Sequence, residues 1–441
     1  MPHDPAPALH IQDELHLLQE ELGAFAGHYE TLVRYCEKAL STLPSKVIAA
    51  TATIEGFEHQ VRHIYGVKRA RRFPGRGYDR LTSFYAEPAT DTKGKPKIAR
   101  IFVAFRSASL HQADAAAFCT EILQTEIDRL VHNPHLALAF LKDATTPDDV
   151  FLLLLHYTTS LNYVGSLPRG TRVMQELEKV AEKTRPETAR EMTVEYHSSR
   201  STGAEVAALV HRIEQPPKWA APEFLDALVA TNMISHGVDL ERINLMVMDG
   251  IPEETAEYIQ ASSRSGRKHI GIVVVVLPAF SIRATSIYHR FLEYHEHLDR
   301  MVSPVPVNRF AKYAARRTLP GIVMGLVYGR HAAETGNQRL KERHTANAML
   351  QAMGPAVLDE LRGAYALGQG VYDKNLELGL DQTLAEQLDI VEGSIRTSQE
   401  KNLRDAIRPT PMRSLRDVEV GVPFWPDVDY TVLQVVKKVK D

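Results

Sequence analysis

Residues 228–267 read LVATNMISHGVDLERINLMVMDGIPEETAEYIQASSRSGR. Two short apolar runs in this stretch, LVA and INLMVM, are each followed by polar residues, and the part from Thr255 onward has the composition of a helix. Apolar runs of this length are typical of parallel strands that are buried on both faces. The stretch therefore predicts two strands and a helix of a parallel α/β sheet.

The same alternation extends over most of the first 278 residues. Short apolar runs predict strands within 8–18, 45–56, 97–105, 149–159, 191–199 and 270–278. Helical periodicity is found between them, at 28–40, 110–141, 171–184 and from residue 203 onward. This order predicts a doubly wound parallel sheet. Beyond Pro278 the sequence changes to long amphipathic segments, which predict a C-terminal helical accessory region.

The length of the chain bounds its domain organisation. With 441 residues, the chain exceeds the roughly 250 to 300 residues at which one hydrophobic core stops growing. A composition of 44% hydrophobic and 24% charged residues is typical of a globular protein and excludes wholesale disorder. We predict three parts, at residues 1–78, 79–280 and 281–441.

Cysteine usage and hydropathy indicate the compartment. The chain has two cysteines, neither in a CxxC pair, so no disulfide framework or zinc knuckle is expected. The longest apolar runs, FLLLL at 151–155 and GIVVVVLPAF at 271–280, fall short of the roughly 20 residues of a membrane helix. They predict buried strands. The N-terminal MPHDPAPALH shows no secretory signal, and we expect a cytoplasmic protein.

Basic residues cluster in two places although the net charge is only -3. These clusters are GVKRARRFPGRG at 66–77 and RFAKYAARR at 309–317. Either could contact phosphate, while a solvated surface is the commoner outcome for each taken alone.

Two pairs of polar residues follow the first two predicted strands. Asp13 and Glu14 could hold Mg²⁺ and polarise an attacking water, respectively. The alternative for this pair is a helix N-cap with its first-turn acid. Thr51 and Thr53 could link a hydrolytic site to a bound polymer through hydrogen bonds, or could simply cap a strand edge.

A third constellation follows the strand that ends near Ala230. Thr231, Gly237 and Asp239 lie in ATNMISHGVDL. The glycine permits an unusual turn, and the aspartate could accept a hydrogen bond from a ribose hydroxyl or an arginine.

The fourth constellation is QASSRSGR. Gln260, Arg264 and Arg267 fall on one helical face or at its end, and two fixed guanidiniums could stabilise the charge that develops on a transferred phosphate. The alternative is an arginine-rich surface helix. The small residues Ser263 and Gly266 favour close approach by a ligand.

Taken in order, these four constellations resemble motifs II, III, V and VI of superfamily 2 helicases, and FLLLLHYTTSLN resembles motif IV by position. The segments IQDELHLL, ATNMISHGVDLERINLMVM and TAEYIQASSRSGR are most similar to the DrmA-like helicases of DISARM-type anti-phage defence systems. The resemblance spans about residues 8–278.

This resemblance implies two RecA-like parallel sheets, a partial first and a complete second, with ATP and Mg²⁺ as cofactors. By position, Asp13 and Glu14 would serve Mg²⁺ and water, and Arg267 would be the arginine finger. The other implied roles are coupling or nucleic-acid contact for Thr51, Thr53 and Thr231, nucleotide contact for Gly237, Asp239 and Gln260, and catalysis for Arg264, which would face the phosphates with Arg267. The expected partner is single-stranded or duplex nucleic acid, with DNA favoured.

The sequence departs from the helicase pattern in one respect. No GxxxxGK[ST] phosphate loop occurs, since the TKGKPK at 92–97 lacks the spacing and the hydroxyl. We therefore expect only the C-terminal part of the first RecA-like domain and poor ATP hydrolysis by the chain alone. The chain would be a truncated helicase, one part of a split enzyme whose partner polypeptide carries the phosphate loop, or a remnant that binds without hydrolysing. The alternative is a non-catalytic nucleic-acid-binding or assembly module with a RecA-like fold.

Overall fold

The computed structural model divides the chain into two compact units. Unit 1 comprises Met1–Arg71 and Pro304–Asp441, and unit 2 comprises Arg72–Ser303. Each unit is described by itself. The structure describes residues 7–40, 45–51, 56–73, 75, 82, 84–85, 87–138, 140–141, 145–181, 191–198, 200–219, 221, 223–231, 240–331 and 338–410.

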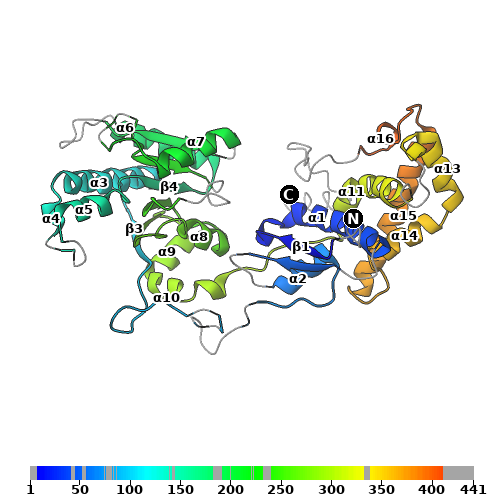
Figure 1. Ribbon diagram of the computed structural model, residues 1–441, viewed down its shortest axis with the longest axis horizontal. Helices are drawn as coiled ribbons and strands as arrows, with labels where there is room; N and C mark the ends of the chain where they lie inside the picture. Colours follow the sequence, from blue (N-terminus) through cyan, green and yellow to red (C-terminus); the bar gives the residue numbers. More distant parts are fainter. Residues whose placement is uncertain are drawn as a thin grey trace, which may run out of the picture. The chain divides into compact units, whose positions relative to one another are not determined.

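Unit 2 is built on a six-stranded parallel sheet with the strand order β3-β8-β7-β4-β6-β5 (Figure 1). The strands are β3 (Arg100–Arg106), β4 (Ser160–Val164), β5 (Val194–His197), β6 (Ala227–Ala230), β7 (Leu245–Asp249) and β8 (Gly271–Leu277). The predicted parallel α/β sheet is confirmed.

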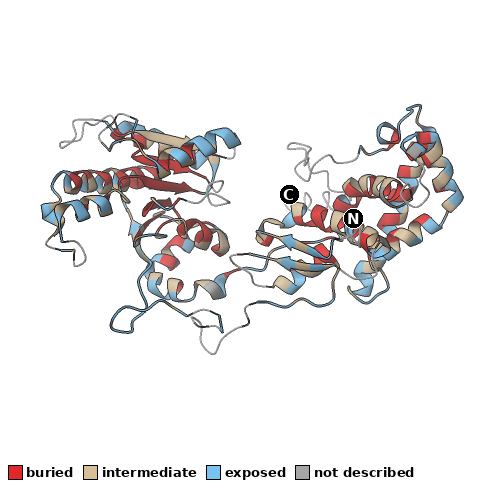
Figure 2. Ribbon diagram, in the orientation of Figure 1, coloured by how far each residue is buried: buried red, intermediate tan, exposed pale blue. Residues whose placement is uncertain are grey.

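Helices cover both faces of this sheet. Alternate residues of β8 face opposite ways, because side chains alternate along a strand: Val274 and Val276 contact α3 (Gln112–His132), and Val273 and Val275 lie in the core shared with α8 (Thr255–Ser262). Burial on both faces explains the continuous apolar runs of the inner strands, and Figure 2 shows the central strands of the sheet as buried. The edge strands β3 and β5 are only partly buried. The other helices of unit 2 are α4 (His135–Leu138), α5 (Pro147–Leu154), α6 (Leu167–Ala181), α7 (Gly203–Glu214), α9 (Ile282–His289), α10 (Phe291–Glu296) and the 3-10 helix η3 (Leu298–Met301).

The run FLLLL forms a helix, so the predicted strand at 149–159 is wrong. Thr146 caps α5, because its side chain accepts a hydrogen bond from the Asp149 amide and the Asp149 side chain accepts one from the Thr146 amide. Pro147 occupies the first turn, where its missing amide proton costs nothing. This capping box outweighs the strand-like composition. The strand follows at Ser160–Val164, so the motif IV position also moves.

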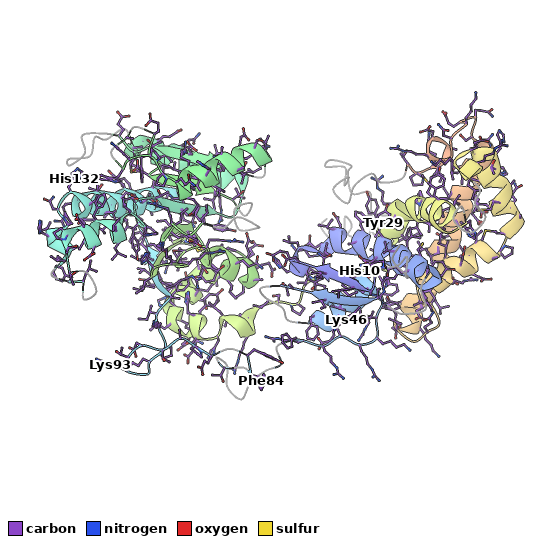
Figure 3. All side chains as sticks on the ribbon, in the orientation of Figure 1. His10, Tyr29, Lys46, Phe84, Lys93 and His132 are labelled. Atoms are coloured by element: carbon purple, nitrogen blue, oxygen red, sulfur yellow. The ribbon has the colours of Figure 1, made fainter. Side chains whose placement is uncertain are left out.

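Unit 1 contains the two-stranded parallel sheet of β1 (Leu9–Gln12) and β2 (Lys46–Ala49). His10 on β1 and Lys46 on β2 are labelled in Figure 3, and His10 Nε2 lies 2.5 Å from Glu37 Oε1. The neighbouring helices are η1 (Leu15–Leu17), α1 (Glu20–Leu40) and α2 (Phe57–Tyr65).

The predicted accessory region is helical, and from Pro304 onward it belongs to unit 1. Its core residues, such as Leu319 and Leu384, pack with Leu32 and Tyr35 of α1. The helices are α11 (Lys312–Gly325), the π-helix η4 (Leu326–His331), the 3-10 helix η5 (Gln338–Lys341), α13 (Arg343–Met353), α14 (Ala356–Ala364), α15 (Lys374–Thr397) and α16 (Leu403–Ala406).

Arg309 of the second basic cluster is fully buried rather than solvated. Its guanidinium donates to the Gly27 carbonyl at 2.7 Å, to Thr31 Oγ1 and to Tyr372 Oη, and it lies 5.7 Å from the ring centre of Tyr365. These bonds tie the segment before α11 to α1 and to the loop before α15. Satisfied hydrogen bonds are what make a buried charge tolerable.

The limits of the two units do not coincide with the predicted boundaries at residues 78 and 280. Ala284, Ile287 and Tyr294 lie in the core of the unit 2 sheet, which extends that unit to Ser303. The three-part division stays a prediction. No helix in the described ranges is long and apolar enough to cross a membrane.

Candidate functional site

The residues of QASSRSGR meet at one turn. Gln260 is buried in the last turn of α8, which ends at Ser262, and Arg264 and Arg267 follow in the connection to β8. Arg264 is half-buried and Arg267 is exposed. We call residues 263–267 the arginine turn. The structure thus brings three predicted site residues together, two of them beyond the helix rather than on its face.

The arginine turn is held in place by two residues that the sequence did not indicate. Arg100 at the start of β3 donates from Nε to the Ser265 carbonyl at 2.6 Å and from Nη2 to the Ser263 carbonyl at 3.1 Å. Asn244, just before β7, accepts a hydrogen bond from the Gly266 amide at 3.2 Å. Both contacts fix the backbone, so the arginines project from a rigid base.

Gly266 permits the close approach of the arginine turn to the sheet. Its φ is +80°, and a Cβ there would lie 2.6 Å from the Ala99 carbonyl oxygen and 2.9 Å from the Gly271 nitrogen. A residue with a side chain would be strained in this conformation and would also overlap the backbone.

Positive charge accumulates at this turn. Burial lowers the pKa of Arg100, and the nearby charge of Arg267 lowers it further. A guanidinium stays protonated in proteins, so both groups carry their charge. Two cations in one small region make a site that attracts an anion.

A second polar group lies at the carboxyl edge of the same sheet. Thr231 follows β6 and is buried, and its Oγ1 has no hydrogen-bond partner among the described residues. Gly237 and Asp239 lie outside the described residues. Neither the ribose contact predicted for Asp239 nor the turn predicted for Gly237 is tested.

Arginines that the sequence analysis missed lie at this edge too. Burial raises the pKa of Asp249 at the end of β7, and Arg169, His111 and Arg172 oppose that rise. At Gly250, whose φ is +91°, a Cβ would lie 3.6 Å from Arg169 Nη1. The signal was available, because LPRGTR follows the apolar run SLNYV and opens a helix, where backbone amides also attract anions.

In unit 1 the structure brings Glu14 and Thr51 together through a histidine. His16 Nδ1 lies 3.3 Å from Glu14 Oε2 and 3.0 Å from Thr51 Oγ1. Asp13 is exposed directly after β1, and its Oδ1 accepts a hydrogen bond from the Glu14 amide at 2.9 Å. Thr53 lies outside the described residues.

A magnesium ion is compatible with this arrangement. Within the described residues, no group of three or more His, Cys, Asp or Glu side chains is placed to hold a metal ion. Mg²⁺ bound together with a nucleotide commonly needs only one or two carboxylates, because phosphate oxygens and water complete its shell. The exposed carboxylate of Asp13 fits that limited role.

Comparison with known proteins finds a match within unit 2. Residues 171–269 match the helicase conserved C-terminal domain, and this range includes Thr231, Gln260, Arg264 and Arg267. This match confirms the predicted resemblance to helicases over these residues.

The chain is also 32% identical over 333 residues to the DISARM protein DrmA of Bacillus paralicheniformis, and this match covers 73% of the chain. It spans only 28% of that relative's length.

Solved helicase structures resemble the chain as well. The DUF1998 helicase MrfA bound to DNA and AMPPNP is 14% identical, with a TM-score of 0.44, covering 73% of this chain and 37% of MrfA. The helicase Lhr of Mycobacterium smegmatis, bound to single-stranded DNA and AMP-PNP, is 13% identical with a TM-score of 0.42, covering 72% of this chain and 34% of Lhr.

Proposed function

We propose that this chain is part of an ATP-dependent helicase or translocase of superfamily 2 that acts in anti-phage defence. The observation that carries the proposal is the arginine turn. It presents Arg264 and Arg267 from a backbone fixed by Arg100 and Asn244, inside the segment that matches the helicase C-terminal domain.

The chemistry proposed for the arginine turn is charge stabilisation. Phosphoryl transfer depends on positioning and on neutralising charge on the transferred group. Arg267, being exposed, is proposed as the arginine finger, Arg264 as a second catalytic cation that faces the phosphates, and Gln260 as a contact to the nucleotide. A rigid base favours this role, because preorganised donors need not reorganise during the reaction.

The residues after β1 are proposed to act in the same reaction. Asp13 would hold Mg²⁺, which when bound neutralises charge on the β and γ phosphate oxygens. Glu14 would orient and polarise the attacking water. His16 lies within hydrogen-bond distance of Thr51 and in ion-pair distance of Glu14, which supports a coupling role for Thr51; the same role is proposed for Thr53.

Nucleic acid is proposed to bind at the carboxyl edge of the unit 2 sheet. Thr231 offers a hydroxyl without a hydrogen-bond partner among the described residues, and Arg169 and Arg172, which act on Asp249 at the end of β7, supply positive charge on the same edge. Such groups suit contacts to a phosphate backbone. Gly237 and Asp239 are proposed to contact the nucleotide, and DNA is the favoured strand.

The proposed reaction needs a phosphate loop that the printed sequence does not contain. We propose that it comes from residues outside this chain, either in a longer polypeptide or in a separate partner. The defence role and a cytoplasmic location are proposed from the similarity to the DISARM protein.

The test is ATP turnover by the chain assembled with the polypeptide that supplies the phosphate loop. Arg267→Ala is expected to lower nucleic-acid-stimulated hydrolysis by about a hundredfold or more and to leave strand binding within about threefold. The matched control is Arg129→Ala, an exposed arginine on α3 paired with Glu126. Equal, measurable turnover in the wild type and Arg267→Ala would contradict the role proposed for Arg267, whereas no nucleic-acid-stimulated turnover by the assembled wild type would support the non-catalytic binding module instead.

A further inference from the structure

A cavity of about 610 Å³ lies at the amino edge of the unit 2 sheet, opposite the carboxyl edge described above. Its lining comes from α5, from the residues just before β4 and β7, and from the residues that join the arginine turn to β8. The volume lies within the range of small-molecule sites.

One wall of the cavity is cationic. Arg242 and Lys268 line it, and Arg242 Nη2 donates to the Leu155 carbonyl at 3.2 Å, which fixes the guanidinium against this wall. Among the residues named for the lining, the single carboxylate is Asp149. That carboxylate accepts hydrogen bonds from the Thr145 and Thr146 amides at 3.0 and 2.8 Å, so it serves the start of α5. Outside the lining, the charge of Glu214 acts on Arg242 and partly offsets the effect of burial on its pKa.

The remaining walls suit a flat, partly apolar group. Leu152, Leu153 and Leu155 supply the apolar surface. The rings of His156 and His269 also line the cavity, with their centres 4.3 Å apart. The Nδ1 atom of His156 is buried without a hydrogen-bond partner among the described residues. The cavity therefore offers imidazole rings and an unsatisfied polar atom beside two positive charges, of which that of Arg242 is fixed by its hydrogen bond to the Leu155 carbonyl.

We propose that this cavity binds a nucleoside 5′-phosphate, either as a free nucleotide or as the phosphorylated 5′ end of a strand. Two cations match a phosphate dianion better than a carboxylate, and an arginine fork favours phosphate oxygens. The leucines and imidazole rings accommodate the base, because aromatic faces stack on bases with little sequence preference. This site adjoins the arginine turn, because Lys268 directly follows Arg267, but its lining includes no residue of that turn.

The test measures binding of 5′-AMP to the full chain by calorimetry. Adenosine and inorganic phosphate, the two parts of 5′-AMP, are measured in the same way. 5′-AMP is expected to bind about tenfold or more tightly than either. Lys268→Met removes a cation, and Leu152→Glu places a negative charge in the cavity at a position that is already 61% exposed. Each is expected to weaken binding of 5′-AMP about tenfold.

Matched controls share the chemistry but lie outside the cavity. They are Lys179→Met on α6, whose lysine is paired with Glu176, and Leu136→Glu on α4, whose leucine is 47% exposed. Both are expected to bind like the wild type. If 5′-AMP does not bind, or if the cavity variants bind as well as their controls, the inference is wrong.

Two further comparisons separate the sources and the sites. Oligonucleotides of one sequence with a 5′-phosphate or a 5′-hydroxyl show whether a strand end is the ligand. If the chain binds the 5′-phosphorylated strand more tightly and Lys268→Met abolishes that preference, the ligand is the strand end. If 5′-AMP binds but the two oligonucleotides bind equally, the ligand is the free nucleotide. Arg267→Ala is expected to keep 5′-AMP binding. Loss of binding in Arg267→Ala would place 5′-AMP at the arginine turn, overturning this inference and leaving the proposed function intact.

Discussion

At the scale of single residues, the arginine turn depends on contacts that are distant in sequence. Arg100 and the carbonyls of Ser263 and Ser265 are more than 160 positions apart, so no local pattern could have predicted their hydrogen bonds. Gln260, Arg264 and Arg267 were predictable because their residue types and spacing already suggest phosphate chemistry. The hydrogen bonds from Arg100 to the backbone of this turn were not predictable, because they depend on which strand becomes the neighbour of β8.

Gly266 offers a direct test of this support. Gly266→Ala is expected to destabilise unit 2 by about 2 kcal/mol, because the new Cβ meets backbone atoms at a positive φ. Displacement of the arginine turn should also lower ATP turnover in the assembled enzyme. Thermal unfolding and steady-state hydrolysis measure the two effects. The control is Gly203→Ala in α7, where a Cβ would meet nothing within 4 Å, and equal losses in both variants would contradict the argument.

At the scale of elements, the sheet of unit 2 was predictable and α5 was not. The runs at β6, β7 and β8 are bounded by polar residues and are too short for helices, so a buried parallel strand was the natural interpretation. FLLLL has the same composition, and periodicity cannot separate a short buried strand from a helix. The deciding signal was Thr146, Pro147 and Asp149, which together begin a helix.

The capping box of α5 is therefore expected to carry measurable stability. Thr146→Ala removes the side-chain acceptor for the Asp149 amide and should destabilise unit 2 by about 1 kcal/mol. Chemical denaturation measures the change. Thr171→Ala, which alters an exposed hydroxyl on α6, should cost less. If the two variants are equally stable, the cap does not hold α5.

At the scale of whole units, unit 1 encloses histidines that stay neutral. Burial, reinforced by the charge of Arg309, lowers the pKa of His28 to about 3. The pKa of His63 falls to about 4, first through burial and then through His59, Arg309 and Arg62. The unfolded chain has a histidine pKa near ~6.5, so it binds more protons than the folded chain below that pH. The stability these groups provide is complete above about pH 6.5 and is lost as the pH falls toward 4 and then 3.

His28→Gln tests this dependence. Glutamine can still donate to the Arg309 carbonyl and accept from Tyr365, as His28 does, but it cannot be protonated. We expect the melting temperature of the variant to fall less than that of the wild type between pH 7 and pH 4.5. His132→Gln, at an exposed position on α3, should keep the wild-type slope. Parallel profiles for His28→Gln and the wild type would contradict the assignment.

The division of the chain into these two units could not be predicted from the sequence. Amphipathic segments after Pro278 predicted helices, but periodicity does not say which surface a helix will cover. Only the packed chain shows that α9 and α10 join the sheet of unit 2 and that α11 joins α1. The predicted site residues are thereby distributed over both units, with Asp13, Glu14 and Thr51 in one and the arginine turn in the other.

The most direct measurement is the affinity of the assembled enzyme for ADP with aluminium fluoride, which resembles the transferring phosphate, compared with its affinity for ADP alone. The arginine turn should act mainly on the transition state. Arg267→Ala is therefore predicted to weaken binding of the analogue by about a hundredfold and binding of ADP by less than about threefold. Equal affinity of the wild type and Arg267→Ala for the analogue would contradict the claim that Arg267 stabilises phosphoryl transfer.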